Sequence, residues 1–191
     1  MKTSLAAVVL EMLVAKQFGQ ANFAKLDPMT VGLPHPEAYA ALMSGKTEIA
    51  AHFASPSFSI LELADPKIHS VVLASEVLGP ATLDVVYAPK RFVDANPKLM
   101  TAFLAAMEEA NATIAADPRS AAQSFIRIGA VKQSEAEVMA MIADKDTHFS
   151  TTPGGVMQYA DFLFAVGSVK LHPQSWRDMF MPAAQELAGS R

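Results

Sequence analysis

The sequence predicts an α/β protein, with a mostly parallel sheet flanked by helices and a helical C-terminal tail. Up to about residue 95, helical patterns alternate with short apolar runs rich in β-branched residues, which is the order of a parallel sheet covered by helices. From residue 96 onward the apolar periodicity is helical throughout. A chain of 191 residues, 51% of them hydrophobic, suffices for one sizeable core or two small lobes.

The first expected element is a helix over residues 5–17. Thr3 or Ser4 is suited to cap its N-terminus, and Gly19 to end it. A secretory signal peptide is the alternative, because a lysine precedes the apolar run. Glu11 interrupts that run and favours the helix. The apolar residues that recur at helical spacing are Leu5, Val8, Val9, Met12 and Leu13.

A second helix is expected over 37–43 and a strand over 47–53, with Gly45 ending the helix between them. The Gly-Lys-Thr at 45–47 is not a phosphate-binding loop. Such a loop runs from a strand into a helix and carries a glycine five residues before its Gly-Lys pair, where Ala40 stands here.

The remaining elements follow from turn residues and apolar periodicity. A helix over 57–65 and strands over 68–75 and 82–89 complete the α/β part. The tail should hold helices that begin at Pro97 and Pro118, a helix opened by a capping box of Ser134 and Glu137, a helix from Thr152 to about Gly167, and a short helix over 175–180.

Composition excludes several classes of function. The net charge is −4 with both signs scattered along the chain, so nucleic acid is not an expected partner. The absence of cysteine excludes disulfides and thiolate chemistry. The five histidines show no metal-ligand spacing, and a Gly-x-Ser-x-Gly nucleophile elbow is lacking. We therefore expect no catalytic residues, no metal and no cofactor.

Three short segments are placed where ligands sit at the edge of an α/β sheet. Residues 2–4 open a helix with hydroxyls and free N–H groups, which suits an anion. The apolar stretch 29–33 is interpreted as a short strand, and residues 33–37 lead from its end into another helix. Residues 52–58 deliver an aromatic ring and a hydroxyl before the chain turns at Pro56. Each segment alone fits an ordinary helix start, and their common placement predicts a binding site.

The segment VGLPHPEAYAALMSGKTEIAAHFASPSF (31–58) resembles the second lobe of solute-binding proteins from the nitrate, sulfonate and taurine class of ABC transporters. VVYAPKRFVDANPKLMTAFLAAMEEANATI is similar to that family's return strand and following helix, and TTPGGVMQYADFLFAVGSV with SWRDMF to its tail. The resemblance implies a type II periplasmic-binding-protein lobe at 1–95 and a helical region at 96–191 that packs on both lobes. The leading strands of the first lobe are expected to be absent.

The same resemblance implies a function. The protein would reversibly bind a small anionic or zwitterionic solute, of the nitrate, sulfonate, taurine or pyrimidine-precursor class, by cleft closure. It would deliver this solute to an ABC permease from the periplasm. Thr3 and Ser4 would bind the anionic head, His35 would donate a hydrogen bond, and Phe53 would stack on the solute. The expected ligand-binding residues are Thr3, Ser4, His35, Phe53, Ser55 and Pro56.

Two alternatives stay open. The first is an enzyme of the related thiamine-pyrimidine synthesis class. The members of that class depend on a cysteine motif that this chain lacks. A truncated fragment that binds nothing is the other alternative, and an upstream in-frame continuation of the gene would support it. A lobe without its leading strands would also expose apolar surface, so we expect self-association through that surface.

Overall fold

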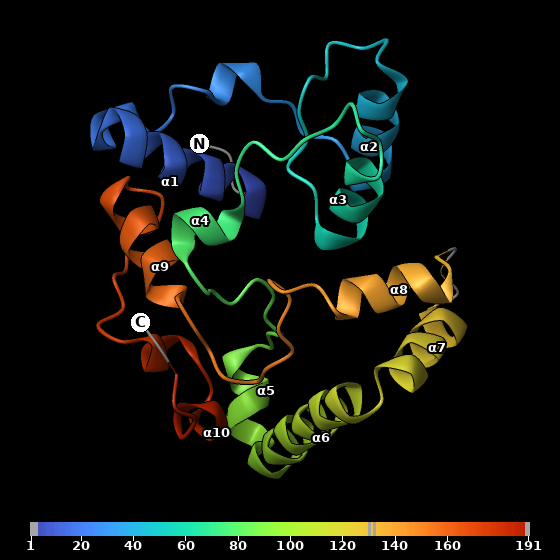
Figure 1. Cartoon of the computed structure of the whole chain (residues 1–191). Helices are drawn as coiled ribbons and strands as arrows, with labels where there is room; N and C mark the ends of the chain where they lie inside the picture. Colours follow the sequence, from blue (N-terminus) through green and yellow to red (C-terminus); the bar gives the residue numbers. More distant parts are fainter. Residues whose placement is uncertain (1–3, 130, 132, 190–191) are drawn as a thin grey trace. The chain divides into compact units, whose positions relative to one another are not determined.

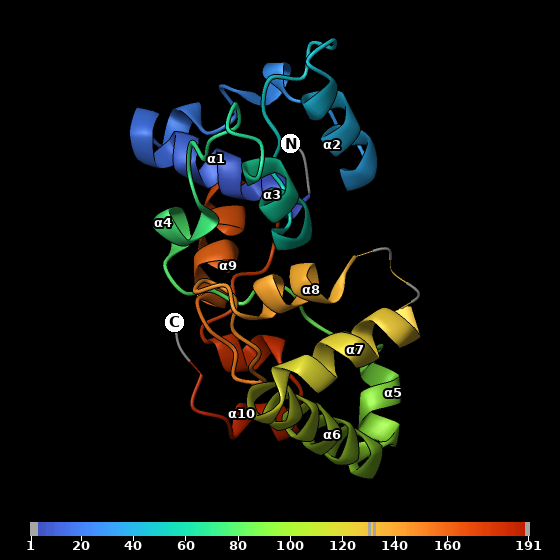
Figure 2. The ribbon, with the colours of Figure 1, turned by 45° about the vertical axis from the view of Figure 1, so that its right-hand side comes forward.

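The computed structural model describes residues 4–129, 131 and 133–189. The chain forms two compact units, unit 1 (Met1–Val77) and unit 2 (Leu78–Arg191), and each is described by itself. The described residues are 58% helical and contain no strand (Figures 1 and 2). The prediction of an α/β fold was therefore wrong, and with it the type II periplasmic-binding-protein lobe and the resemblance to ABC solute-binding proteins. The protein is helical.

Unit 1 consists of short helices joined by extended segments (Figure 1). They are α1 (Leu5–Phe18), the 3-10 helices η1 (Gln20–Asn22) and η2 (Asp27–Met29), α2 (His35–Ser44), α3 (Pro56–Leu63) and α4 (Ala74–Leu78), whose last residue belongs to unit 2. Helices α2 and α3 pack side by side in both views (Figures 1 and 2).

Helix α1 confirms the helix expected at the start of the chain. The Ser4 hydroxyl caps it by accepting a hydrogen bond from the Ala7 N–H at 3.2 Å. Gly19 ends it with φ at 89°, a backbone conformation that glycine adopts without strain. Val9 and Val14 are buried, and so is Glu11, the residue that argued against a signal peptide.

Unit 2 contains the 20-residue helix α6 and several shorter helices. They are α5 (Lys90–Ala95), α6 (Pro97–Ala116), α7 (Pro118–Gly129), α8 (Glu135–Ile142), α9 (Val156–Ala165), the 3-10 helix η3 (Trp176–Met179) and α10 (Pro182–Gln185). Helix α7 lies between α6 and α8, and α10 packs against α6 (Figures 1 and 2). Nowhere in the described part of the chain is a helix both long and apolar enough to cross a membrane.

Acidic side chains fix the start of α8. The predicted capping box is confirmed, because Ser134 and Glu137 each accept a backbone N–H of the other. The Ser134 N–H and the Ser134 hydroxyl both donate to the Glu137 carboxylate, and these two bonds lower the pKa of Glu137. Glu135 accepts from Gln123 at 3.0 Å and from Arg119 at 2.6 Å, and both bonds lower its pKa. Helix α8 is thereby joined to α7 through side chains.

The segment before α5 is fastened to the start of α9. The Thr82 N–H donates to the Gly154 carbonyl at 2.7 Å, and the Gly154 N–H donates to the Thr82 hydroxyl at 2.9 Å. The side-chain amide of Gln158 donates to the Leu78 carbonyl at 2.7 Å. A Cβ on Gly155 would lie 2.9 Å from the Cβ of Ala81, so this close approach requires glycine.

The four predicted strands are wrong. The stretch 29–33 begins at the last residue of η2 and continues without regular structure. Residues 47–53 and 82–89 are irregular, and 68–75 is irregular until α4 begins at Ala74. Side chains expected in a buried sheet are exposed, with Val71 at 82%, Val86 at 73% and Tyr87 at 90%. A short apolar run favours a strand only when another segment pairs with it, and such pairing is not encoded locally.

The packing in both units is loose. The solvent-accessible surface is 12876 Å², whereas two separate compact domains of these lengths would expose about 10,600 Å². Helix α6, described over its whole length, contains no buried residue, and its predicted apolar stripe stays exposed at Leu99, Phe103 and Met107. Burial on that helix is partial and falls on Met100, Leu104, Asn111 and Ile114.

Replacing Val9 by Asp should destabilise the protein. Val9 is 3% exposed, so the substitution buries a carboxylate at a cost of about 3 kcal/mol or more. Urea unfolding would measure the loss, with Gln17→Asp, which adds the same charge at an exposed position of α1, as the control. Equal stability of the two variants would contradict the burial of Val9.

The close approach at Gly155 predicts a second difference. Gly155→Ala adds both a positive-φ strain of about 1–2 kcal/mol and an overlap of about 1–3 kcal/mol with Ala81. Gly167→Ala is a matched control, since Gly167 has φ at 73° but open space around its Cβ position. Thermal unfolding should rank Gly155→Ala as clearly the less stable. Similar losses for both would show that residues 80–82 do not approach Gly155 closely.

Candidate functional site

The strongest candidate site lies in unit 1, where α2, α3 and the segment between them bring three side chains into a row. His35 is the first residue of α2, His52 lies in the connecting segment, and Glu62 lies near the end of α3. Nδ1 of His52 is 2.7 Å from Oε1 of Glu62, and Nε2 of His52 is 2.9 Å from Nδ1 of His35. We call these three residues the histidine relay.

The relay runs from a shielded end to an open end. The side chains of His52 and Glu62 are only 7% and 6% exposed, whereas His35 is exposed. A buried ionisable pair is stable only where its polar atoms are hydrogen-bonded, and the two bonds of His52 meet this requirement. The Nε2 of His35 is therefore the relay atom that a ligand can reach.

With Glu62 ionised and both rings neutral, the two bonds allow one arrangement of the ring protons. A carboxylate only accepts hydrogen bonds, so Nδ1 of His52 must carry the proton that Glu62 accepts. Nε2 of a neutral His52 then holds a lone pair, and Nδ1 of His35 must donate to it. In a neutral His35 the remaining nitrogen, Nε2, is left as an acceptor.

Aromatic rings flank the open end of the relay. The ring of Phe58 stacks on His35 with centroids 5.6 Å apart and an interplanar angle of 23°. Tyr39 meets Phe58 at 6.0 Å and 50°. Ring faces carry partial negative charge, so this arrangement attracts a cation placed near His35.

The structure brings together two of the three segments that the sequence predicted to form a site. Residues 33–37 and 52–58 meet at the bond between His35 and His52 and at the stack of His35 on Phe58. Sequence reasoning selected His35 but missed His52 and Glu62. Their separations along the chain, 17 and 10 residues, follow no helical or motif spacing, so no local signal marks them.

The other predicted ligand-binding residues are placed as follows. Phe53 is partly buried, Ser55 stands at the N-cap position of α3 with its hydroxyl 3.2 Å from that of Ser57, and Pro56 is the first residue of α3. Ser4 caps α1, as described above. Thr3 lies outside the described residues, so a role of Thr3 and Ser4 in binding an anion stays a prediction.

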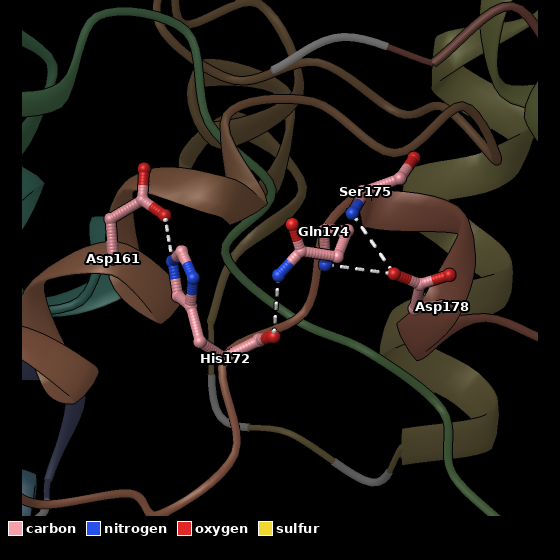
Figure 3. Close-up of polar contacts among 5 residues, drawn as sticks. All are labelled: Asp161, His172, Gln174, Ser175 and Asp178. Atoms are coloured by element: carbon pink, nitrogen blue, oxygen red, sulfur yellow. Dashed lines mark hydrogen bonds and ion pairs between the residues drawn. The ribbon is translucent and has the colours of Figure 1, made fainter.

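A second constellation lies in unit 2, after α9. Nε2 of His172 is 2.7 Å from Oδ1 of Asp161 (Figure 3). The His172 ring also stacks on Phe164, with centroids 4.7 Å apart. The side chains are 35% and 56% exposed, so this pair gains little from shielding. Gln174 donates to the His172 carbonyl, and Asp178 accepts two backbone N–H groups at the start of η3 (Figure 3). These bonds fasten the loop after α9, which is a structural role.

The remaining features are weaker candidates. No group of three or more His, Asp or Glu side chains in the described part of the chain could hold a metal ion. An open groove of about 410 Å³ lies between α6 and α7. It is lined mainly by small side chains, among them Ala110, Thr113, Ser120 and Ser124, and it offers little to fix a ligand.

In comparisons with known proteins, no protein-family model, no curated protein and no solved structure matches this chain. The function is therefore argued from the histidine relay alone.

The buried bond of the relay predicts a stability effect. Glu62→Leu keeps the volume but leaves the Nδ1–H of His52 without its acceptor, at a cost of about 1–3 kcal/mol. Glu62→Gln keeps an acceptor and should cost less. Urea unfolding would compare both with Glu37→Gln, which changes an exposed glutamate on α2 and should shift stability by less than about 0.5 kcal/mol. A Glu62→Leu variant as stable as the parent would mean that this bond does not hold the segment.

Proposed function

We propose that unit 1 reversibly binds a small solute at Nε2 of His35, without covalent chemistry. Of the anionic and zwitterionic solutes expected from the sequence, the relay favours the zwitterion. The observation that carries this proposal is the row of bonds from the shielded Glu62 through His52 to the exposed His35.

The relay favours an N–H donor for two reasons. With Glu62 as a carboxylate, the outer nitrogen of His35 is an acceptor and the relay carries one negative charge. Phe58 and Tyr39 add the partial negative charge of their ring faces. An ammonium group would donate to His35 and lie against these rings. The role expected for His35 from the sequence, that of a donor, is therefore reversed in this proposal.

Helix α2 contributes little to anion binding. Pro36 has no N–H, and the N–H groups of Glu37 and Ala38 both donate to the Pro34 carbonyl. Glu37 also places an acidic side chain in the first turn. These features support an ammonium group, rather than an anionic head, as the part of the solute that meets His35.

A general-base enzyme is the second candidate. An imidazole oriented through a buried carboxylate is the arrangement that general bases use. Among the described residues, however, no hydroxyl is hydrogen-bonded to His35, so binding has the better support. Product formation from a candidate substrate would favour the enzyme. The ABC permease partner and the periplasmic location were implied by the resemblance alone; they stay predictions on which this proposal does not depend.

Taurine and isethionate are a matched pair of probes, since they differ in an ammonium and a hydroxyl group. One charged hydrogen bond and an exposed cation–π contact support only a millimolar affinity. NMR titration of the histidine ring nitrogens should show taurine binding at least about tenfold more tightly than isethionate near pH 8.

Variants connect that binding to His35. His35→Phe keeps an aromatic ring against Phe58 and removes the acceptor, so taurine affinity should fall about tenfold or more. His69→Phe is the control, because it changes an exposed histidine of unit 1 outside the relay. The proposal fails if the two probes bind equally, or if His35→Phe retains the affinity of the parent.

A further inference from the structure

We infer that a single proton reverses the ligand preference of the histidine relay: without it the outer nitrogen of His35 takes an ammonium group, and with it the same nitrogen takes an anion. This inference rests on the proposed binding at His35 and adds its regulation by pH. It follows from the two bonds that join His35, His52 and Glu62.

The proton balance of the relay is simple. Before protonation, Nδ1 of His52 donates to Glu62 and Nδ1 of His35 donates to Nε2 of His52. A proton added at Nε2 of His35 allows the Nδ1 proton of His35 to pass to Nε2 of His52. His35 is then neutral again, with an N–H pointing outward, and His52 is an imidazolium. One proton has entered, and every other atom is retained.

The added charge comes to rest beside Glu62. The imidazolium of His52 and the carboxylate of Glu62 are 2.7 Å apart in a shielded environment, where a charge-assisted hydrogen bond is strong. The relay as a whole becomes neutral and its outer atom a donor. An anion can then approach without repulsion from Glu62, and an ammonium group loses its acceptor.

The surrounding ionisable groups do not produce this reversal. They are Glu37 and Tyr39 on α2, Lys46 and Glu48 in the connecting segment, and Asp65, Lys67 and His69 after α3. Among the described contacts, none of these groups is hydrogen-bonded to either imidazole, so none of them is placed to pass a proton along the relay.

Methylammonium and methanesulfonate, two small probes of opposite charge, test the inference with the full chain. NMR titrations at about pH 5.5 and about pH 8 would measure both affinities. Methylammonium should bind about tenfold or more tightly at the higher pH, and methanesulfonate about tenfold or more tightly at the lower pH.

Glu62→Gln separates this switch from a purely structural role. Glutamine still accepts the His52 proton but cannot pair with an imidazolium, so methanesulfonate binding at about pH 5.5 should weaken about tenfold in this variant. Glu48→Gln removes an exposed carboxylate of the connecting segment, to which no role in binding is assigned, and should leave both pH profiles in place. A Glu62→Gln variant with the parent's pH profiles would overturn the inference.

The possible outcomes separate a failure of the proton switch from a failure of the proposed binding at His35. If neither probe binds at either pH, the proposed function at His35 fails. If methylammonium binds equally at both pH values and methanesulfonate binds at neither, the binding function stands and the proton switch is wrong.

Discussion

Backbone hydrogen bonding is the constraint on which the structure depends. The described residues contain no β ladder, so each helix satisfies its own N–H and carbonyl groups, and the extended segments between helices have to be held by side chains. In unit 1 the bond of His52 to Glu62 fixes residues 46–55 against α3. In unit 2 the bonds of Thr82 with Gly154 fix the segment before α5. A few polar contacts thus hold these segments in place, whereas a strand in a sheet would be held by backbone hydrogen bonds along its whole length.

The same bond that holds the connecting segment in unit 1 also sets the chemistry of the candidate site. Glu62 accepts one proton of His52, and this fixes which nitrogen of His35 is free. A purely apolar contact could hold the segment equally well, but it would leave the protons of both rings undetermined. Because the side chains of His52 and Glu62 are buried, breaking their hydrogen bond would leave polar atoms unsatisfied in a low-dielectric environment, at a high cost in free energy. In the binding proposed for His35, stability and ligand preference would therefore be coupled through a single carboxylate.

The sequence predicted local features well and non-local ones poorly. The Ser4 cap, the Gly45 stop of α2 and the capping box of Ser134 with Glu137 each involve residues within a few positions of one another, and all three are present. The strands at 68–75 and 82–89 failed because a β-branched run specifies an extended backbone but not the partner that would pair with it. Proline at 80 and 89 also leaves the second run short between two residues that cannot donate to a ladder.

In the candidate site, too, the sequence predicted local features but not the contacts between residues that are distant along the chain. The prediction that 33–37 and 52–58 act together assumed the edge of a sheet; in the structure they meet through the packing of α2 on α3 and the bond between His35 and His52. His35 could be selected from the sequence because it opens a helix after Pro34. The sequence could not predict whether the free nitrogen of His35 donates or accepts a hydrogen bond. That role depends on Glu62, which lies 10 residues beyond His52 and is connected to His35 only through His52. The sequence gives the type of each side chain, but the tautomer of a histidine depends on the hydrogen bonds that it forms in the folded protein.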